Sequence, residues 1–428
     1  MLKQSKKKAW IFGLILLGLC FAFHFNSCKE ADRASRIKPV EVAVSQKVSH
    51  SPFQAAIARF ESQLAQDVAE DGVGSISAGV VVGNDLIWAK GFGWADIERK
   101  IPADKETIYR TGSISKSFTA VLMMVMVEDG FFGLDDPVEK YFPDINNLSK
   151  KPENSPSITF RRLASHTAGL NREPKLRDAA KGPISQWENK ILASIPQTSY
   201  KSSPGEQYSY SNIGFGILGL AVSRASGTPF IELVRGHIFE PLGMKSSFFI
   251  LTAEYLPHMA MGYVKRKDGT VSAEFPALEH AGRGYKVPNG GIYSTVGDLA
   301  KFVAAMIGAA PVKIFSEETR LEILKRQTPE GGGGYGLGFS IRRDKEGFQT
   351  IGHGGSVAGY NASMIFEPKS KIGVIIFRNY NRGKTNLGRV TRALLKELGK
   401  AKSSKSLPPS PQIHPQTGNS FSDHQLKN

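Results

Sequence analysis

The chain has 428 residues, of which 41% are hydrophobic and 22% are charged, a composition typical of a globular protein and not of a disordered one. Its formal net charge is +16, and most of the excess lies in two terminal segments, 1–38 and 384–428. The sequence shows no basic stripe with interleaved aromatic residues, so we expect no nucleic-acid partner. Terminal charge of this kind is more typical of a chain held near an anionic membrane.

Residues 1–28 have the order of a secretory signal: a basic start, then an apolar run, then an abrupt change to polar residues. Only two cysteines occur, Cys20 inside the run and Cys28 just after it, so the rest of the chain contains no disulfide. "FNSC" resembles a bacterial lipoprotein cleavage box, which makes Cys28 a lipidation candidate; a chance cysteine or a retained membrane anchor are the alternatives. We therefore expect an exported protein, either membrane-anchored through its N-terminus or periplasmic.

Segment 29–50 lacks periodicity and is interpreted as a tether. Folding is expected to begin at residue 51, because Ser51 is a suitable cap for a helix that ends near residue 72. The next segment, 75–98, predicts two strands joined by a hairpin.

Strand and turn signals return in 335–380, and a helical pattern follows them, whereas about 134–279 is mostly helix and loop. This order predicts an α/β fold of the α+β type, with an antiparallel sheet built from both chain ends, flanking helices and a mostly helical inserted subdomain. We expect this domain to span 51–398. The tail 399–428 is rich in Pro, Ser and Gln and is expected to be disordered.

The stretch 109–120 reads "YRTGSISKSFTA" and opens an almost wholly apolar, helix-compatible segment. Positions three apart share a helix face, so Ser113 meets Lys116, whereas Ser115 and Ser117 point elsewhere. A serine hydroxyl needs a base, and a lysine serves as one only if burial or a nearby cation keeps its amine neutral. The pattern therefore predicts Ser113 as a nucleophile and Lys116 as its base.

Two later segments accompany this pattern. "QYSYSNIGFGILG" carries Tyr210 and Asn212 before a Gly-rich apolar helix, and "IGHGGSVAGY" carries His353 at the end of a predicted strand. With "SISK" they resemble, in the same chain order, the Ser-x-x-Lys, Tyr-x-Asn and Lys-Thr-Gly motifs of the serine β-lactamase and penicillin-binding-protein superfamily. The resemblance covers about 55–398 and is nearest to the branch of class C β-lactamases, D-aminopeptidases, D-Ala-D-Ala carboxypeptidases and esterases.

The resemblance implies roles for matching residues. Ser113 would be acylated, and Lys116 would accept its proton. Tyr210, with a phenol acidified by neighbouring cations, would carry protons to the leaving group and activate the deacylating water. The backbone N–H groups of Ser113 and Ser356 would form the oxyanion hole.

A substrate-binding role is implied for Asn212, His353, Gly354 and Gly355. His353 departs from the family pattern, because β-lactamases and many carboxypeptidases carry there a lysine that helps to bind the substrate carboxylate. A histidine with an ordinary pKa of ~6.5 is mostly neutral at pH 7, so we expect weak affinity for β-lactams. Histidine at this position resembles instead the aminopeptidase and esterase-like members.

Other polar motifs are weighed against this site. His166 in "SHTAGL" is a candidate triad base, but its Gly-containing turn favours a structural role. "GGGGYGLG" at 331–338 is interpreted as a flexible lip of the cleft, because a strand follows it and no lysine is placed for phosphate. His237 and His280 have no partners at metal-ligand spacing, so we expect neither a metal nor a cofactor.

We expect an exported serine hydrolase that cleaves an ester or amide in a small-molecule or peptide substrate through an acyl-enzyme at Ser113. One alternative is a β-lactamase or D-Ala-D-Ala carboxypeptidase acting on cell-wall peptides. An alternative of another class is a catalytically silent binding or scaffolding protein of the same fold. The enzyme is favoured because a scaffold has no reason to hold a lysine in a core helix. The sequence leaves the natural substrate and the oligomeric state open.

Overall fold

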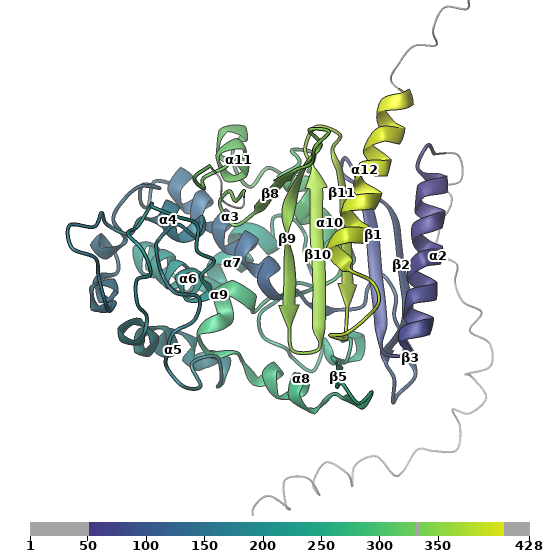
Figure 1. Ribbon diagram of the computed structural model, residues 1–428, viewed down its shortest axis with the longest axis horizontal. Coiled ribbons are helices and arrows are strands. Elements are labelled where there is room, and N and C mark those ends of the chain that lie inside the picture. Colours follow the sequence, from purple (N-terminus) through teal and green to yellow (C-terminus); the bar gives the residue numbers. More distant parts are fainter. Residues whose placement is uncertain (1–50, 331–333, 406–428) are drawn as a thin grey trace, which may run out of the picture. The chain divides into compact units, whose positions relative to one another are not determined.

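The structure is a computed structural model that describes residues 51–330 and 334–405 (Figure 1). The predicted signal segment with Cys28 and the predicted tether lie outside the described residues. Most of the predicted disordered tail and the first glycines of the predicted lip also lie outside them.

The core of the fold is a seven-stranded antiparallel sheet in the order β3-β2-β1-β11-β10-β9-β8. Its strands are β1 (Ser75–Val82), β2 (Asp85–Asp96), β3 (Ile101–Pro102), β8 (Ser340–Arg343), β9 (Gln349–Val357), β10 (Tyr360–Glu367) and β11 (Ile372–Arg378). The two ends of the chain meet where β1 pairs with β11, with Val80 opposite Val374. The predicted fold class, an antiparallel sheet built from both chain ends, is confirmed.

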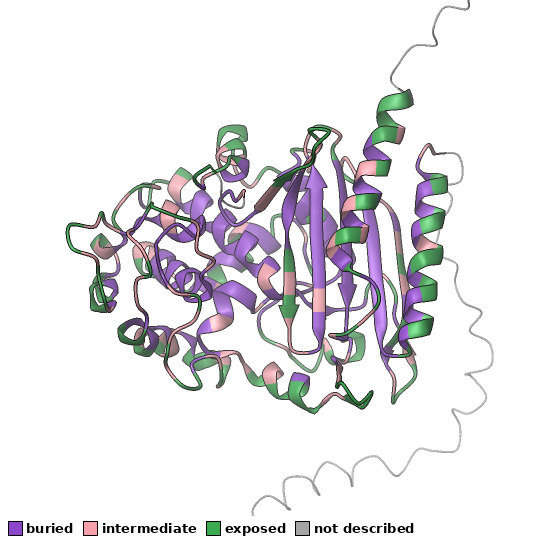
Figure 2. Cartoon of the chain, in the orientation of Figure 1, coloured by how far each residue is buried: buried purple, intermediate pink, exposed green. Residues whose placement is uncertain are grey.

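Both faces of the central strands β1 and β11 are buried (Figure 2). On one face lie the terminal helices α2 (Gln54–Asp71) and α12 (Leu387–Lys405) (Figure 1). Successive side chains of a strand point to opposite faces, so Val374 and Ile376 of β11 pack with these two helices. Ile375 and Phe377 pack instead into the larger core on the other face.

That larger core surrounds α3 (Ser115–Glu128), a helix in which every residue from Ser115 to Met126 is buried. A helix that is apolar on all sides is stable only inside a protein. The helices that contact it include α6 (Asn212–Ser226), α7 (Phe230–Val234), α9 (Val287–Gly290), α10 (Val296–Met306) and α11 (Glu317–Leu324). Further described helices are α4 (Phe160–Ala164), α5 (Trp187–Ser194) and α8 (Glu274–Leu278).

Two short strand pairs complete the described fold. β4 (Tyr109–Arg110) pairs with β7 (Tyr293–Ser294), and β5 (Val264–Lys265) pairs with β6 (Val271–Ser272). Among the described residues no single helix is long and apolar enough to cross a membrane. One pair of helical segments, Asn212–Ser226 and Phe230–Phe239, meets the criteria of length and composition together, but it is bent by 87°.

Two predicted boundaries are corrected. The first helix begins at Gln54 instead of at residue 52, because Ser51 caps a preceding turn: its Oγ accepts a hydrogen bond from the Phe53 N–H at 3.2 Å. The last helix continues to Lys405, so residues 399–405 are helical although they were assigned to a disordered tail. The physical reason is that Ala401 continues the apolar stripe of Leu398 against the sheet.

Candidate active site

Ser113 lies in a single 3-10 turn, η2 (Gly112–Ile114), which leads directly into α3. Lys116 lies one turn further along, and its Nζ donates a hydrogen bond to the Ser113 Oγ at 3.1 Å. The neighbouring serines point elsewhere, as their spacing predicted. Ser115 Oγ donates to the Gly112 carbonyl at 2.8 Å, and Ser117 Oγ donates to the Gly338 carbonyl at 2.8 Å.

Lys116 is fully buried, and no carboxylate accepts a hydrogen bond from it among the described residues. Its Nζ donates to the backbone carbonyl of Asn289 at 3.1 Å and lies 5.0 Å from the centre of the Tyr210 ring. Burial first, and then the positive charges of Lys286 and Arg283, hold the pKa of Lys116 well below its usual value of 10.5. The lowered pKa favours the neutral amine beside the Ser113 hydroxyl.

Tyr210 stands just before α6, with the guanidinium of Arg172 4.8 Å from its ring centre. Burial raises the pKa of Tyr210 to about 12, because it outweighs the lowering by a hydrogen bond with Ser113 and by the charge of Arg172. The charge of Arg172 does lower the pKa of this phenol, as expected, but burial has the larger effect and the net shift is upward. Tyr210 is a neutral phenol, hydrogen-bonded to Ser113, that is able to donate a proton.

The edge of β9 approaches the turn that carries Ser113, because β8 pairs only with the first half of β9. A Cβ atom on Gly355 would lie 1.9 Å from the carbonyl oxygen of Thr111, and one on Gly112 would lie 2.7 Å from the backbone nitrogen of Ser356. Only glycines allow this approach. It brings the backbone nitrogen of Ser356 beside the turn of Ser113, and the oxyanion hole expected from these two residues stays a prediction.

Asn212 is the first residue of α6, and the Ser211 hydroxyl caps this helix by accepting from the Gly214 N–H at 2.9 Å. The Asn212 side chain donates to Glu173 at 2.5 Å and does not line the cavity at Ser113. Its predicted contact with substrate therefore has no support in the geometry.

Glu173 was missed by the sequence reasoning. Its carboxylate also accepts from the Tyr285 hydroxyl and pairs with Lys286 at 3.3 Å. Burial alone would raise the pKa of Glu173, but the hydrogen bonds from Tyr285 and Asn212 and the charge of Lys286 lower it. No motif marks Glu173 in the sequence, because its partners come from segments that are distant along the chain.

His353 is buried beneath the strand edge. Its Nδ1 donates to its neighbour's carbonyl, that of Gly354, at 2.6 Å, so its Nε2 accepts from the Tyr335 hydroxyl at 2.9 Å. Burial lowers the pKa of His353 to about 3, so the ring is neutral. The side chain does not line the cavity at Ser113, whereas Gly354 and Gly355 do, so direct contact between His353 and a substrate carboxylate is not supported.

His166 occupies the left-handed region with a φ of 61°, and its Nδ1 accepts from the Ser211 N–H at 3.1 Å. Its ring centre lies 4.2 Å from that of Tyr210, and burial holds its pKa well below 6.5. These contacts agree with the structural interpretation, since the ring supports the loop that carries Tyr210. Elsewhere, His280 shares a hydrogen bond of 2.9 Å with the Tyr293 hydroxyl. Within 51–330 and 334–405, no cluster of three or more His, Cys, Asp or Glu side chains is arranged to hold a metal ion.

A cavity of about 650 Å³ opens over Ser113 and Tyr210. Three cations line it, and each already has a partner. Arg378 donates to the Thr385 carbonyl at 2.9 Å, Lys384 pairs with Glu70, and Arg172 lies 3.9 Å from Glu173. The position at which the family motif carries a lysine is occupied by His353, and the cations that line the described part of the cavity are already paired.

Comparisons with known proteins agree with this geometry. A family model described as Beta-lactamase matches residues 60–397. The Bacillus subtilis (strain 168) protein named "Putative penicillin-binding protein PbpX" is 25% identical over 92% of this chain and 95% of its own length. Beta-lactamase-like protein 2 of Dictyostelium discoideum is 28% identical over 76% of this chain, which spans only 59% of that longer protein. The structure of the octameric penicillin-binding protein homologue from Pyrococcus abyssi superposes with a TM-score of 0.67 and 30% identity, covering 80% of this chain and 77% of that one.

The two glycines of β9 provide a matched pair of variants. Gly355→Ala places a Cβ against the Thr111 carbonyl, so it should push the strand edge away from Ser113 and lower kcat for a p-nitrophenyl ester by about 10²-fold. Gly354→Ala is the control, because its Cβ would lie 3.7 Å from the Ala362 carbonyl oxygen, which is an ordinary contact. Equal kcat values for the two variants, each shown to be folded by circular dichroism, would contradict the account of the strand edge.

Proposed function

The chain belongs to the beta-lactamase family, and from this premise we propose that it is a serine hydrolase that forms an acyl-enzyme at Ser113. One observation carries the proposal. The Lys116 Nζ lies 3.1 Å from the Ser113 Oγ in a fully buried position, where its pKa is well below the usual value. Burying a lysine without a carboxylate partner costs stability, and a proton acceptor for Ser113 explains why the fold retains it.

Acylation begins when the neutral Lys116 amine takes the proton of the Ser113 hydroxyl. The serine oxygen then bonds to the carbonyl carbon of the ester or amide, and the carbonyl electron pair moves to its oxygen. The backbone N–H groups of Ser113 and Ser356 stabilise that negative charge. Breakdown of the tetrahedral intermediate breaks the bond to the leaving group and leaves the acyl group on Ser113.

Tyr210 has the position and protonation state for the second proton transfer. Its phenol is hydrogen-bonded to Ser113 and carries its proton at neutral pH, because its pKa is about 12. It donates this proton to the leaving oxygen or nitrogen and recovers one from the ammonium of Lys116, whose Nζ lies 5.0 Å from the Tyr210 ring centre. Deacylation follows the same path in reverse, with water as the nucleophile.

The electrostatics of the cleft favour substrates without a carboxylate near the scissile bond. His353 is neutral and buried, and the lining cations Arg378 and Lys384 already have partners in the fold. We therefore propose esters or neutral-ended amides of small molecules or peptides as substrates. The alternative, a β-lactamase or D-Ala-D-Ala carboxypeptidase, is supported by the relatives described as penicillin-binding proteins. From the sequence of residues 1–28 we also propose that the protein is exported and held at a membrane.

Replacing Lys116 distinguishes an enzyme from a catalytically silent scaffolding protein. Lys116→Met keeps the shape of the side chain and removes the base, so ester hydrolysis should fall by at least 10²-fold. Folding should become more stable, because the native state no longer buries an amine that water hydrates in the unfolded chain. Each kcal/mol gained raises Tm by about 2–4 °C in a domain of this size.

The pH dependence of that gain identifies its cause. Between the lowered folded pKa of Lys116 and 10.5, the unfolded chain binds more protons than the native one, so wild-type stability rises with pH. The advantage of Lys116→Met should therefore shrink as the pH approaches 10.5. A variant that is active, or one that is less stable than the wild type at pH 7, would contradict the proposal and favour a structural lysine.

Substrate preference tests the argument from His353. The wild type should hydrolyse a short-chain p-nitrophenyl ester with a higher kcat/KM than a chromogenic cephalosporin, because Arg172, Arg378 and Lys384, the cations that line the described part of the cavity, already have partners in the fold. A carboxylate hydrogen bond to a cation is worth ~1.5–3 kcal/mol, so its absence accounts for about tenfold to a hundredfold in rate constant. A preference for the cephalosporin would replace this assignment with a β-lactamase.

A further inference from the structure

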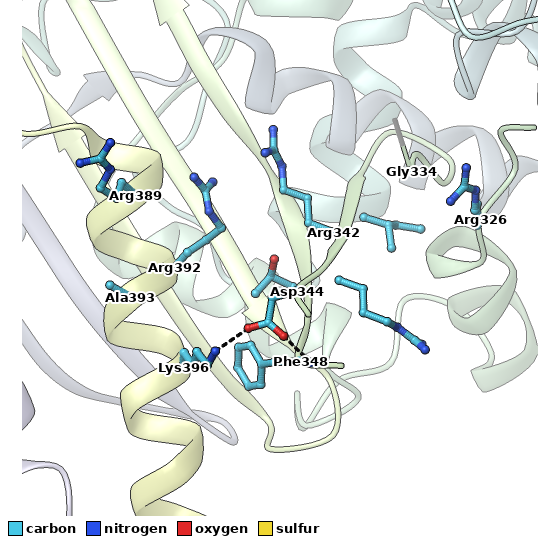
Figure 3. A pocket seen from close by; sticks show the side chains of 12 residues that line it. Arg326, Gly334, Arg342, Asp344, Phe348, Arg389, Arg392, Ala393 and Lys396 are labelled. Atoms are coloured by element: carbon cyan, nitrogen blue, oxygen red, sulfur yellow. Dashed lines mark hydrogen bonds and ion pairs between the residues drawn. The ribbon is translucent and has the colours of Figure 1, made fainter. Parts of the chain in front are cut away.

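A second cavity, of about 700 Å³, lies between β8 and the first turns of α12 (Figure 3). We call it the basic groove, and its charged lining consists of Arg326, Arg342, Arg343, Asp344, Arg389, Arg392 and Lys396. None of the residues proposed for acyl transfer lines it. Positive charge therefore dominates a hollow for which the proposed hydrolase mechanism has no use.

Part of this charge is neutralised within the fold. Asp344 accepts from the Lys396 Nζ at 2.6 Å (Figure 3), and Glu346 pairs with the same Nζ at 2.8 Å. The Arg326 guanidinium donates to the backbone carbonyls of Thr328 and Pro329 at 3.1 and 2.7 Å. The only acidic residue of the lining is thus already occupied.

Four arginines of the lining remain, namely Arg343 and a group of three. Among the described residues, no carboxylate forms an ion pair with Arg342, Arg389 or Arg392. Figure 3 shows their three guanidinium groups extending the same way along the groove, with the Lys396–Asp344 pair at its other end. Burial lowers the pKa of Arg392, and the charges of Arg342 and Arg389 lower it further, so the three are close enough to repel one another.

This repulsion contrasts with two other cations of the same helix, which have carboxylate partners. Further along α12, Lys396 and Lys400 both pair with Glu346, and Glu397 pairs with Arg59 of α2. Three like charges in a hollow cost stability unless an anion neutralises them. The arginine fork binds phosphate and carboxylate oxygens in a bidentate manner, and three forks in one hollow match a group that carries at least two negative charges.

We propose that the basic groove binds a phosphate-bearing ligand, of the diphosphate or phosphate-ester class, through Arg342, Arg389 and Arg392. This site is independent of the chemistry proposed at Ser113. It adjoins the cleft, because Leu387 and Gly388 line the cavity over Ser113 while the next turn of α12 lines the groove. A soluble phosphate ester and a phospholipid head group offer the same chemistry here.

Binding of two probes tests the site in the full chain. Inorganic pyrophosphate is titrated by calorimetry, and vesicles of phosphatidylglycerol in phosphatidylcholine are tested by co-sedimentation against vesicles of phosphatidylcholine alone. We expect Arg342→Gln/Arg392→Gln to weaken binding at least tenfold. The matched control is Arg59→Gln/Arg224→Gln, which removes the same net charge from arginines paired with Glu397 and Glu188. It should bind within twofold of the wild type.

The outcomes separate the two sources of phosphate. Pyrophosphate binding that is lost in the groove variant supports a soluble ligand, and binding only to phosphatidylglycerol vesicles that is lost in the same variant supports a lipid head group. Thermal melting without ligand should show the groove variant folded and no less stable than the wild type, because a repulsion has been removed. Binding of neither probe by the wild type, or equal loss in both double variants, would overturn the proposal.

Discussion

A buried lysine amine beside a serine hydroxyl is the constraint on which the rest of this structure depends. Lys116 is held without a carboxylate partner inside a helix that is apolar on every side. An exposed lysine would keep its proton, so the lowered pKa of Lys116 requires that the surrounding core bury the amine completely. The helical region between β4 and the C-terminal strands supplies this burial, and the cations Lys286 and Arg283 add to its effect.

The sheet has a separate task, which is to bring a strand edge to the nucleophile. Pairing of β1 with β11 joins the two ends of the chain, and the C-terminal strands then place β9 against the turn of Ser113. Gly112 and Gly355 are required because a side chain at either would force the two backbones apart. The reactive group and its oxyanion donor therefore come from opposite ends of the domain and meet only in the complete fold.

What the sequence predicted well was local or was carried by several motifs together. The spacing of Ser113 and Lys116 fixes their contact within one helical turn, and the alternating C-terminal strands indicated the sheet. What it missed depends on distant partners. The motif predicted that His353 contacts the substrate, but the His353 ring is hydrogen-bonded to Tyr335 and buried. Burial raises the pKa of Tyr210, and a sequence motif does not reveal how deeply a side chain is buried. The three arginines proposed to bind phosphate in the basic groove come from β8 and α12, two segments that no common sequence motif connects.

The most direct test of the central claim is the site of covalent labelling by a fluorophosphonate, read by intact mass and peptide mapping. The account predicts one adduct per chain on Ser113, absent from Ser113→Ala. Ser115→Ala should still be labelled at Ser113, because the Ser115 hydroxyl donates to the Gly112 carbonyl and not to the site. Labelling of any other serine, or no labelling of a folded wild type, would contradict the account.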